Sequence, residues 1–452
     1  MLDENQIKTL LNKIFKLSPA RSTEVIVTSI DQLMMRFANN RITQSLSEED
    51  IRVSIRVLHD NKMGRATTNR LDDKSLSACC ERALQIAKNA AVDPDALPLP
   101  GTQTYKEVDS FYEATRHATA YQITNQVEEM ISVGAADLAN LSGMNEIQSM
   151  SYAIGNSQGL FAYNQSTSAT ASVTAFIDEN SGFAICNAHD IRQIDYEQLA
   201  ETAVQKARLG KHPRELPPGE YTVILEPQAV ANLLAFLIID SVSQISPFSG
   251  HALLKKQGFV ALHFGEQVFG TNFTLKDDVY HPEQQGIPFD GEGIPTQTVE
   301  LVKEGVLSGV VHSRSSALQL GAEPTGHGLE LPNPYGALPS HLVLKGGDTT
   351  LDDMIKSTRK GIVITRFWYT RLVDSNSMTI TGMTRDGTFL VENGEITARI
   401  KNLRFNESLF RAFKQIQALG KPVRTLCEES GFIMVVPPLL IDGFRFTDAT
   451  FF

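Results

Sequence analysis

Several signatures of well-defined enzyme classes are missing from this sequence. It has no Walker-type phosphate loop, no G-x-G-x-x-G dinucleotide fingerprint and no G-x-S-x-G nucleophile elbow. None of its ten histidines lies three, four or five positions from another, so it has no local two-histidine metal motif. A zinc site assembled from distant residues stays open, although no pattern supports one. The sequence predicts no cofactor.

Cysteine and long apolar runs are also scarce. The chain has four cysteines and no C-x-x-C pair, and the adjacent Cys79 and Cys80 are poorly placed for a disulfide. Reduced thiols are typical of the cytoplasm. The longest apolar run, Leu233–Ile239, is far shorter than the roughly twenty residues that span a bilayer. The charged N-terminus lacks the apolar segment of a signal peptide. We therefore expect a cytoplasmic protein without a membrane partner.

Positive charge is in deficit, because the net charge is −11 and the pI is near 5.5. No basic run interleaved with aromatic residues occurs, so we expect no direct nucleic-acid partner. The chain of 452 residues is 42% hydrophobic and 21% charged, which is typical of a globular protein. This length favours two domains.

The first part of the sequence mixes helical and strand patterns. Asn39–Asn40 is a turn signal, and Glu146–Asn187 alternates like a meander of antiparallel strands. The periodicity predicts further strands at Glu24–Ile30, Leu33–Phe37 and Ile51–Leu58, and helices at Gln6–Leu17, Lys74–Ala91, Thr119–Ala136 and Tyr196–Leu209. The proline-rich segment Lys211–Tyr221 reads as a linker. We therefore predict domains at 1–215 and 216–452.

The second part opens with a predicted helix, Gln228–Ser243, and continues as strands separated by glycine. Asn393–Gly394 predicts a hairpin, and Asp386–Gly387 predicts a second turn, with Arg385 at a hairpin tip. Leu351–Lys360 and Leu409–Ala418 have helical patterns. The stretch AEPTGHGLE (Ala322–Glu330) superficially resembles part of a zinc-protease helix. Its proline and glycines favour a turn instead.

The segment Phe289–Ser313 (FDGEGIPTQTVELVKEGVLSGVVHS) resembles the TldD/PmbA family, once named modulators of DNA gyrase. The resemblance continues through Ser316–Gly328, His341–Ile355 and Thr381–Ile396, and RFANNRITQS and MGRATTN resemble the opening of the family. It covers nearly the whole chain in order. Trp368–Asp374 departs from the glycine-rich version of the family and suggests a divergent subgroup. The fold implied is α+β, with an N-terminal α/β domain followed by a mostly antiparallel, barrel-like C-terminal β domain.

The family has two kinds of chain, which differ at one helix. The TldD kind carries His-Glu-x-x-x-His there, with a cysteine near the C-terminus as the implied third zinc ligand. In this chain Ala235 and Phe236 occupy the positions of the His-Glu pair, and Asp240 occupies the position of the second histidine. Alanine and phenylalanine cannot bind zinc. The resemblance therefore identifies the PmbA kind, also called TldE, and predicts neither a metal nor a catalytic residue.

Five residues remain as candidates for a cleft. Cys427 lies near the position of the family's cysteine, but a chance or vestigial thiol is the simpler interpretation. Asp290 and Glu292 form an acidic pair that fits turn capping or an interface better than acid–base catalysis. His327 either faces a cleft between domains or is a hydrogen-bonded loop residue. Arg385, at the predicted hairpin tip, is the fifth candidate for a cleft residue.

The function implied by the resemblance is that of a non-catalytic subunit in a metallopeptidase system acting on peptides or unfolded proteins. The alternative is a free-standing binding or regulatory protein, and catalysis through an unrecognised site stays open. The partner implied is a second copy or a TldD-like zinc subunit. Exposed strand edges must be covered, so we expect a two-fold dimer whose interface draws on the C-terminal domain.

Overall fold

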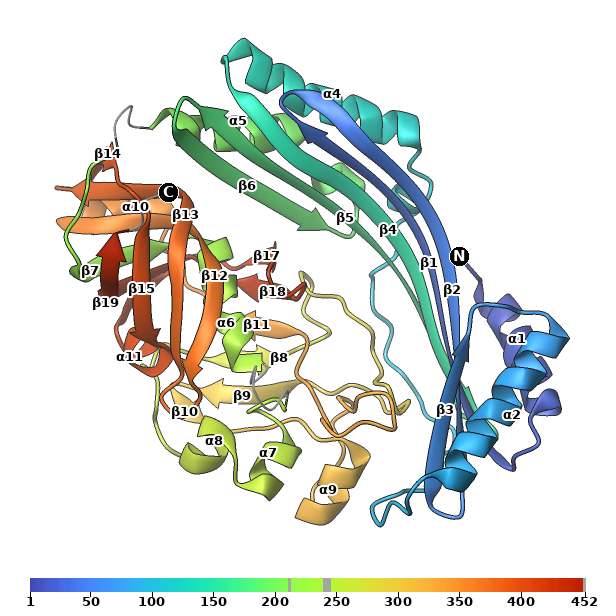
Figure 1. Ribbon diagram of the computed structural model, residues 1–452. Helices are drawn as coiled ribbons and strands as arrows, with labels where there is room; N and C mark the ends of the chain where they lie inside the picture. Colours follow the sequence, from blue (N-terminus) through green and yellow to red (C-terminus); the bar gives the residue numbers. More distant parts are fainter. Residues whose placement is uncertain (210–212, 239–244, 450–452) are drawn as a thin grey trace.

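The computed structural model describes residues 1–209, 213–238 and 245–449, in which a long curved sheet arches over a compact C-terminal region (Figure 1). The sheet has the order β3-β2-β1-β4-β5-β6, and all of its pairs are antiparallel. Its strands are β1 (Ser22–Ala38), β2 (Arg41–His59), β3 (Lys62–Thr68), β4 (Asn140–Asn156), β5 (Phe161–Ile177) and β6 (Asn180–Ala188).

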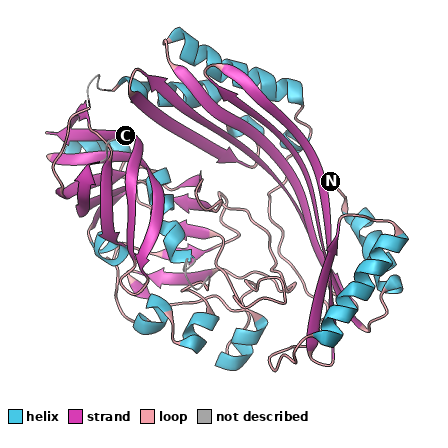
Figure 2. Ribbon diagram, viewed as in Figure 1, coloured by secondary structure: helices cyan, strands magenta, loops and turns pink. Residues whose placement is uncertain are grey.

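Helices cover one face of this sheet (Figure 2). One pair packs at the β3 end and another at the β6 end, and each pair encloses its own apolar core. These helices are α1 (Glu4–Leu17) and α2 (Asp73–Asn89) at the β3 end, α4 (Ala120–Ala136) and α5 (Tyr196–Arg208) at the β6 end, and the short α3 (Glu113–Arg116). The predicted mixture of helices and strands in this region is confirmed.

Successive side chains of β1 point to opposite faces of the sheet, and apolar residues lie on both faces. Val25 and Val27 pack against the helices, whereas Ile26 packs against Phe289 of the C-terminal region. The two strands predicted before Asn39 form the single strand β1. Asn39 and Asn40 make the expected turn, with left-handed φ angles of 50° and 57°. This alternation gives the sheet a helix-facing side and a side that faces the C-terminal region.

The C-terminal region contains a closed five-stranded barrel, because β12 pairs with both β7 and β13. Its strands are β7 (Gly219–Leu225), β12 (Lys360–Asp374), β13 (Thr379–Glu392), β15 (Leu403–Ser408) and β19 (Leu439–Ala449), with β14 (Glu395–Arg399) and β16 (Ile416–Leu419) attached. A six-stranded sheet lies beside it: β10 (Val306–Leu307), β9 (Val299–Lys303), β8 (Leu275–Asp277), β11 (Leu342–Leu344), β18 (Ile433–Val436) and β17 (Val423–Leu426). The barrel-like, mostly antiparallel domain is therefore confirmed.

The main core of this region surrounds α6 (Pro227–Ile238), whose Leu233, Leu234 and Leu237 are fully buried. The other helices are short: α7 (Gly250–Lys255), α8 (Gly258–His263), α9 (Arg314–Leu320), α10 (Leu351–Ser357) and α11 (Leu409–Lys414). The last two end earlier than predicted, because β12 begins at Lys360 and β16 at Ile416. In the described part of the chain, no helix combines the length and apolar character needed to cross a bilayer.

The turn predicted at Asp386–Gly387 is wrong. Both residues lie inside β13, where Arg366 pairs with Arg385 and Ile364 pairs with Thr388. Two residues on β13 thus oppose one on β12, which is a β-bulge. Asp386 and Gly387 supply the positive φ angles of 52° and 136° at this bulge. The hairpin at Asn393–Gly394 is confirmed by the β13–β14 pairing.

Candidate functional site

A cavity of about 320 Å³ lies at the helix where the sequence analysis placed the altered zinc motif. Ala235 and Phe236 project from α6 into its wall, and Cys427 lines it from the loop after β17. Cys427 is fully buried, and its Sγ accepts a hydrogen bond from Asn232 Nδ2 at 3.6 Å. Burial raises the pKa of the Cys427 thiol. Asp240 lies outside the described residues.

A second group of predicted residues meets in the loops that face the sheet. Asp290 Oδ1 accepts the backbone N–H groups of Glu292 and Ile294, both at 2.9 Å, and its Oδ2 accepts that of Gly328 at 2.7 Å. This is a loop-capping geometry. Burial raises the pKa of Asp290, although these three N–H groups oppose the rise.

His327 lies in the same loops and is also buried. Its Nε2 lies 3.0 Å from Asp277 Oδ1, and its Nδ1 lies 3.0 Å from Thr325 Oγ1. Burial lowers the pKa of His327, but the charge and hydrogen bond of Asp277, the charge of Asp290 and the hydrogen bond to Thr325 together outweigh burial, so the net pKa is raised. Gly326 has a φ of +71°, and no helix passes through this segment. The turn predicted for AEPTGHGLE is confirmed.

Glu292 lies near a buried charge network that joins the sheet to the C-terminal region, and its charge acts on Arg56 of that network. Its Oε1 accepts the backbone N–H of Arg314 at 3.1 Å. On the sheet, Arg56 makes two hydrogen bonds, of 2.8 and 2.7 Å, to Glu24, and both residues are at most 2% exposed. Arg65 binds Glu24 as well as Glu330 of the C-terminal loops. These contacts fix the two regions at one end of the sheet.

Arg385 lies apart from these groups, on β13. Its guanidinium stands over the Trp368 ring at 4.8 Å and 3.5 Å from Asp386 Oδ2. The buried Asp386 also binds Arg366 and accepts a hydrogen bond from Ser181 of β6 at 2.8 Å. The bulge therefore anchors the barrel to the far end of the sheet.

Between these two anchoring points, three adjoining cavities separate the sheet from the C-terminal region; together they are called the cleft here. Their volumes are about 380, 280 and 330 Å³. Arg424 lines both the first and the second, and His341 lines both the second and the third. His327 and Asp290 line the third. Cavities of this size are typical of ligand sites.

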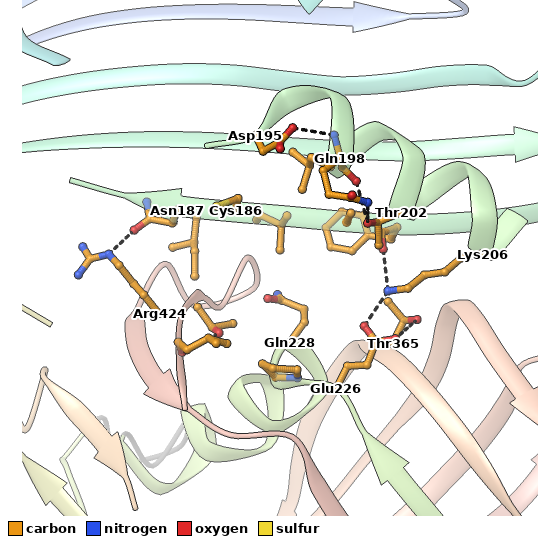
Figure 3. Close-up of a pocket in the computed structure, with 18 of the residues that line it drawn as sticks. Cys186, Asn187, Asp195, Gln198, Thr202, Lys206, Glu226, Gln228, Thr365 and Arg424 are labelled. Carbon is orange, nitrogen blue, oxygen red and sulfur yellow. Dashed lines mark hydrogen bonds and ion pairs between the residues drawn. The ribbon is translucent and has the colours of Figure 1, made fainter. Parts of the chain in front are cut away.

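The largest cavity of the cleft lies between β6, α5, the start of α6 and β17 (Figure 3). At one end Arg424 Nε donates to Asn187 Oδ1 at 2.7 Å. At the other end Lys206 Nζ pairs with Glu226 Oε2 at 2.6 Å. Two side-chain pairs that join the regions therefore bound this cavity.

Comparison with known proteins agrees with this architecture. The chain matches three models of the PmbA/TldA metallopeptidase: domain 1 over residues 23–87, the central domain over 69–210 and the C-terminal domain over 218–448. It is 22% identical to the metalloprotease PmbA of Escherichia coli over 86% of this chain and 85% of that protein. The fold is similar to that of TldE from Thermococcus kodakarensis, with a TM-score of 0.84, 19% identity and coverage of 98% and 99% of the two chains. A protein described as a modulator of a DNA gyrase from Thermotoga maritima has the same TM-score, with 21% identity and coverage of 98% and 100%.

The chain belongs to the PmbA/TldD family. The name of this family implies a metal, but the described residues do not fit a zinc ion. Among the described residues that line the α6 cavity, the only sulfur or imidazole ligand is Cys427, whose thiol is buried and already bonded to Asn232. Glu429 beside it is bound to Thr370. Over the described ranges, no group of three or more His, Cys, Asp or Glu side chains has a metal-binding arrangement, whereas catalytic zinc takes three protein ligands.

The sequence reasoning missed the residues that line the largest of the three cleft cavities in this PmbA/TldD chain. Lys206, Glu226 and Arg424 lie far apart in sequence and meet only in the fold. One signal was available at Gln228, which with Asn232 is one of two polar residues in the mostly apolar helix PQAVANLLAFLI. A polar residue in such a helix needs a partner.

Proposed function

We propose that this chain is a PmbA/TldE-type subunit that holds an extended peptide for a TldD-type metallopeptidase and performs no zinc chemistry itself. The α6 cavity is the observation that carries this proposal. At the positions of the zinc motif it presents a methyl group and a phenyl ring, from Ala235 and Phe236, beside the buried thiol of Cys427. Burial raises the pKa of that thiol, which opposes the thiolate that zinc binding needs.

The shape of the cleft supports a peptide or an unfolded protein as the ligand. It extends between a strand-rich sheet and the C-terminal region, and its wall includes β6 and β17. A folded protein is too large for cavities of about 280 to 380 Å³, whereas an extended segment can enter a narrow cleft and bind through its backbone. The anchoring contacts at both ends of the sheet preorganise the cleft, which lowers the cost of binding.

A second subunit supplies the missing chemistry in this proposal. We expect a two-fold homodimer when the chain is expressed alone in the cytoplasm, and a heterodimer beside a TldD-like zinc subunit. The interface draws on the C-terminal region and exceeds about 1,000 Å², the size of a stable biological contact.

The test uses a TldD-type chain with intact His-Glu-x-x-x-His from the same genome. Light scattering measures the mass of each chain alone and of the mixture, and hydrolysis of an unfolded protein is followed with and without chelator. We expect a mixed complex whose chelator-sensitive activity vanishes when the glutamate in the partner's motif becomes glutamine. Chelator-sensitive peptidase activity of this chain alone, or two chains that stay separate on mixing, would contradict the proposal.

A further inference from the structure

Gln228 is a buried amide to which the described residues offer no hydrogen-bond partner. It lies in the first turn of α6 and is 5% exposed, and neither its Oε1 nor its Nε2 has a hydrogen-bond partner among the described residues. Asn232, one turn further along α6, uses both atoms of its amide, on Cys427 and on the backbone N–H of Phe367. Buried polar groups without partners are rare and costly in native proteins. Gln228 therefore indicates a ligand.

The cavity into which Gln228 projects is the largest of the cleft (Figure 3). The two cations of its wall are already paired, and the Asp195 carboxylate caps α5 by accepting the backbone N–H of Gln198. Lys206 binds Glu226 and the backbone O of Phe183, and Arg424 binds Asn187 and the backbone O atoms of Glu283 and Gln284. Neither Lys206 nor Arg424 is therefore free to pair with an anionic ligand. The free amide instead selects a neutral group that offers one N–H and one C=O side by side.

The adjoining cavity contains a second amide of this kind. Gln284 is 4% exposed, and its Nε2 donates to the backbone O of Ile433 at 2.9 Å, whereas its Oε1 has no described partner. Arg424 lines both cavities, so the two amides belong to neighbouring parts of one cleft. Gln228 with two unpartnered atoms and Gln284 with one, in adjoining cavities, fit a ligand with repeated amide groups.

We propose that Gln228 binds the main chain of an extended peptide, with Oε1 accepting an N–H and Nε2 donating to the C=O of the same residue. In an extended residue these two groups point to the same side, as they do in a hydrogen-bonded antiparallel pair. Gln284 Oε1 accepts a further N–H of the same segment. This assignment rests on the proposed function and deepens it by naming the recognition groups.

Insertion of a complete strand between β6 and β17 is excluded by their spacing. Among the described strands, β6 pairs with β5 alone and β17 with β18 alone, so both present an edge to the cavity. However, Cα atoms of β6 and β17 approach within 8 Å. An intervening strand needs about 9.5 Å, which is twice the spacing of neighbouring strands. Recognition therefore falls to the side-chain amides.

The test measures binding of a fluorescein-labelled decapeptide of alternating Ser and Val to the full-length protein by fluorescence anisotropy. This probe has no Asn or Gln. We expect Gln228→Leu to weaken binding about tenfold or more through two lost hydrogen bonds. The melting temperature should stay unchanged or rise, because the substitution removes two unpartnered polar atoms. The matched control Gln205→Leu, on an exposed position of α5, should change neither quantity.

The outcomes separate the two proposals. A wild-type protein that binds no probe would overturn the peptide-binding function and this inference together. Binding that Gln228→Leu leaves intact would overturn the inference alone, and so would a fall in melting temperature without weaker binding. A second probe with Asn in place of Ser distinguishes main-chain from side-chain amides. We expect equal affinity, whereas dependence of binding on the Asn side chains would contradict main-chain recognition.

Discussion

Replacement of Glu292 by Gln should stabilise this protein, and only at neutral and alkaline pH. Glu292 is 3% exposed, and burial, followed by the charge of Asp290, raises the pKa of its carboxyl to about 7 from 4.5. The folded protein therefore keeps this proton over a pH range in which the unfolded chain has lost it. The contribution of Glu292 therefore lowers the free energy of unfolding as the pH rises from about 4.5 to 7, and the whole loss persists above pH 7.

The size of the effect follows from the pKa difference. At about 1.4 kcal/mol per pH unit, a rise from 4.5 to about 7 corresponds to roughly 3–4 kcal/mol. Glutamine cannot ionise, and its side-chain oxygen can still accept the backbone N–H of Arg314. We expect Glu292→Gln to exceed the wild type by about 3–4 kcal/mol in unfolding free energy at pH 8.5, and to match it near pH 4.5.

Guanidinium unfolding between pH 4.5 and 8.5 measures this difference. Peptide-level hydrogen exchange locates the change, because a chain of this size need not unfold in one step. Glu81→Gln, on an exposed position of α2, is the matched control and should show no pH-dependent difference. A stability gain that is equal at both ends of the pH range would refute the reasoning. A loss at pH 8.5 would show that Glu292 acts as an ionised partner of Arg314.

Three further predictions concern packing, buried charge and assembly. Gly64→Ala should lower the free energy of unfolding by about 1–3 kcal/mol or more, because the new methyl would lie 2.2 Å from a backbone oxygen of α2. The control Gly101→Ala places its methyl where no atom lies within 4 Å, so it should leave thermal unfolding unchanged. Glu24→Leu should cost about 3–5 kcal/mol because it leaves Arg56 buried without its carboxylate, and adding Arg56→Met should recover most of that loss; a double variant no more stable than the single one would contradict this. Light scattering at micromolar concentration should give the mass of a dimer, and a monomer would be evidence against a two-fold assembly.

Local chemistry in the sequence predicted much of the fold. Asn39–Asn40 and Asn393–Gly394 favour positive φ, and both make turns between strands. Asp386–Gly387 has the same preference but serves a bulge inside a barrel strand. The dipeptide predicts only that the backbone adopts positive φ angles. Whether those angles form a hairpin turn or a β-bulge depends on how the flanking residues pair with other strands. Barrel closure depends on pairs far apart in sequence, so family resemblance was needed to expect it.

The candidate site was less accessible from sequence. The resemblance pointed to Ala235, Phe236 and Cys427, and these three residues line one cavity. Two other candidates, Asp290 and His327, line the third cavity of the cleft beside the sheet. The resemblance gave no indication of the largest cavity of that cleft, because this cavity forms where α5, α6 and two edge strands meet. The unpartnered state of Gln228 depends on its neighbours in space, which no local pattern records.

Zinc content tests the central claim most directly. The full-length protein, expressed in zinc-supplemented medium and purified without chelator, is analysed for metal by elemental analysis beside a Cys427→Ser variant. We expect both proteins to hold far less than one zinc per chain, because among the described residues the α6 cavity offers one buried thiol and one carboxylate, that of Glu429, which is already bound to Thr370. One zinc per wild-type chain that is lost in Cys427→Ser would contradict the account of this chain as a subunit without zinc chemistry.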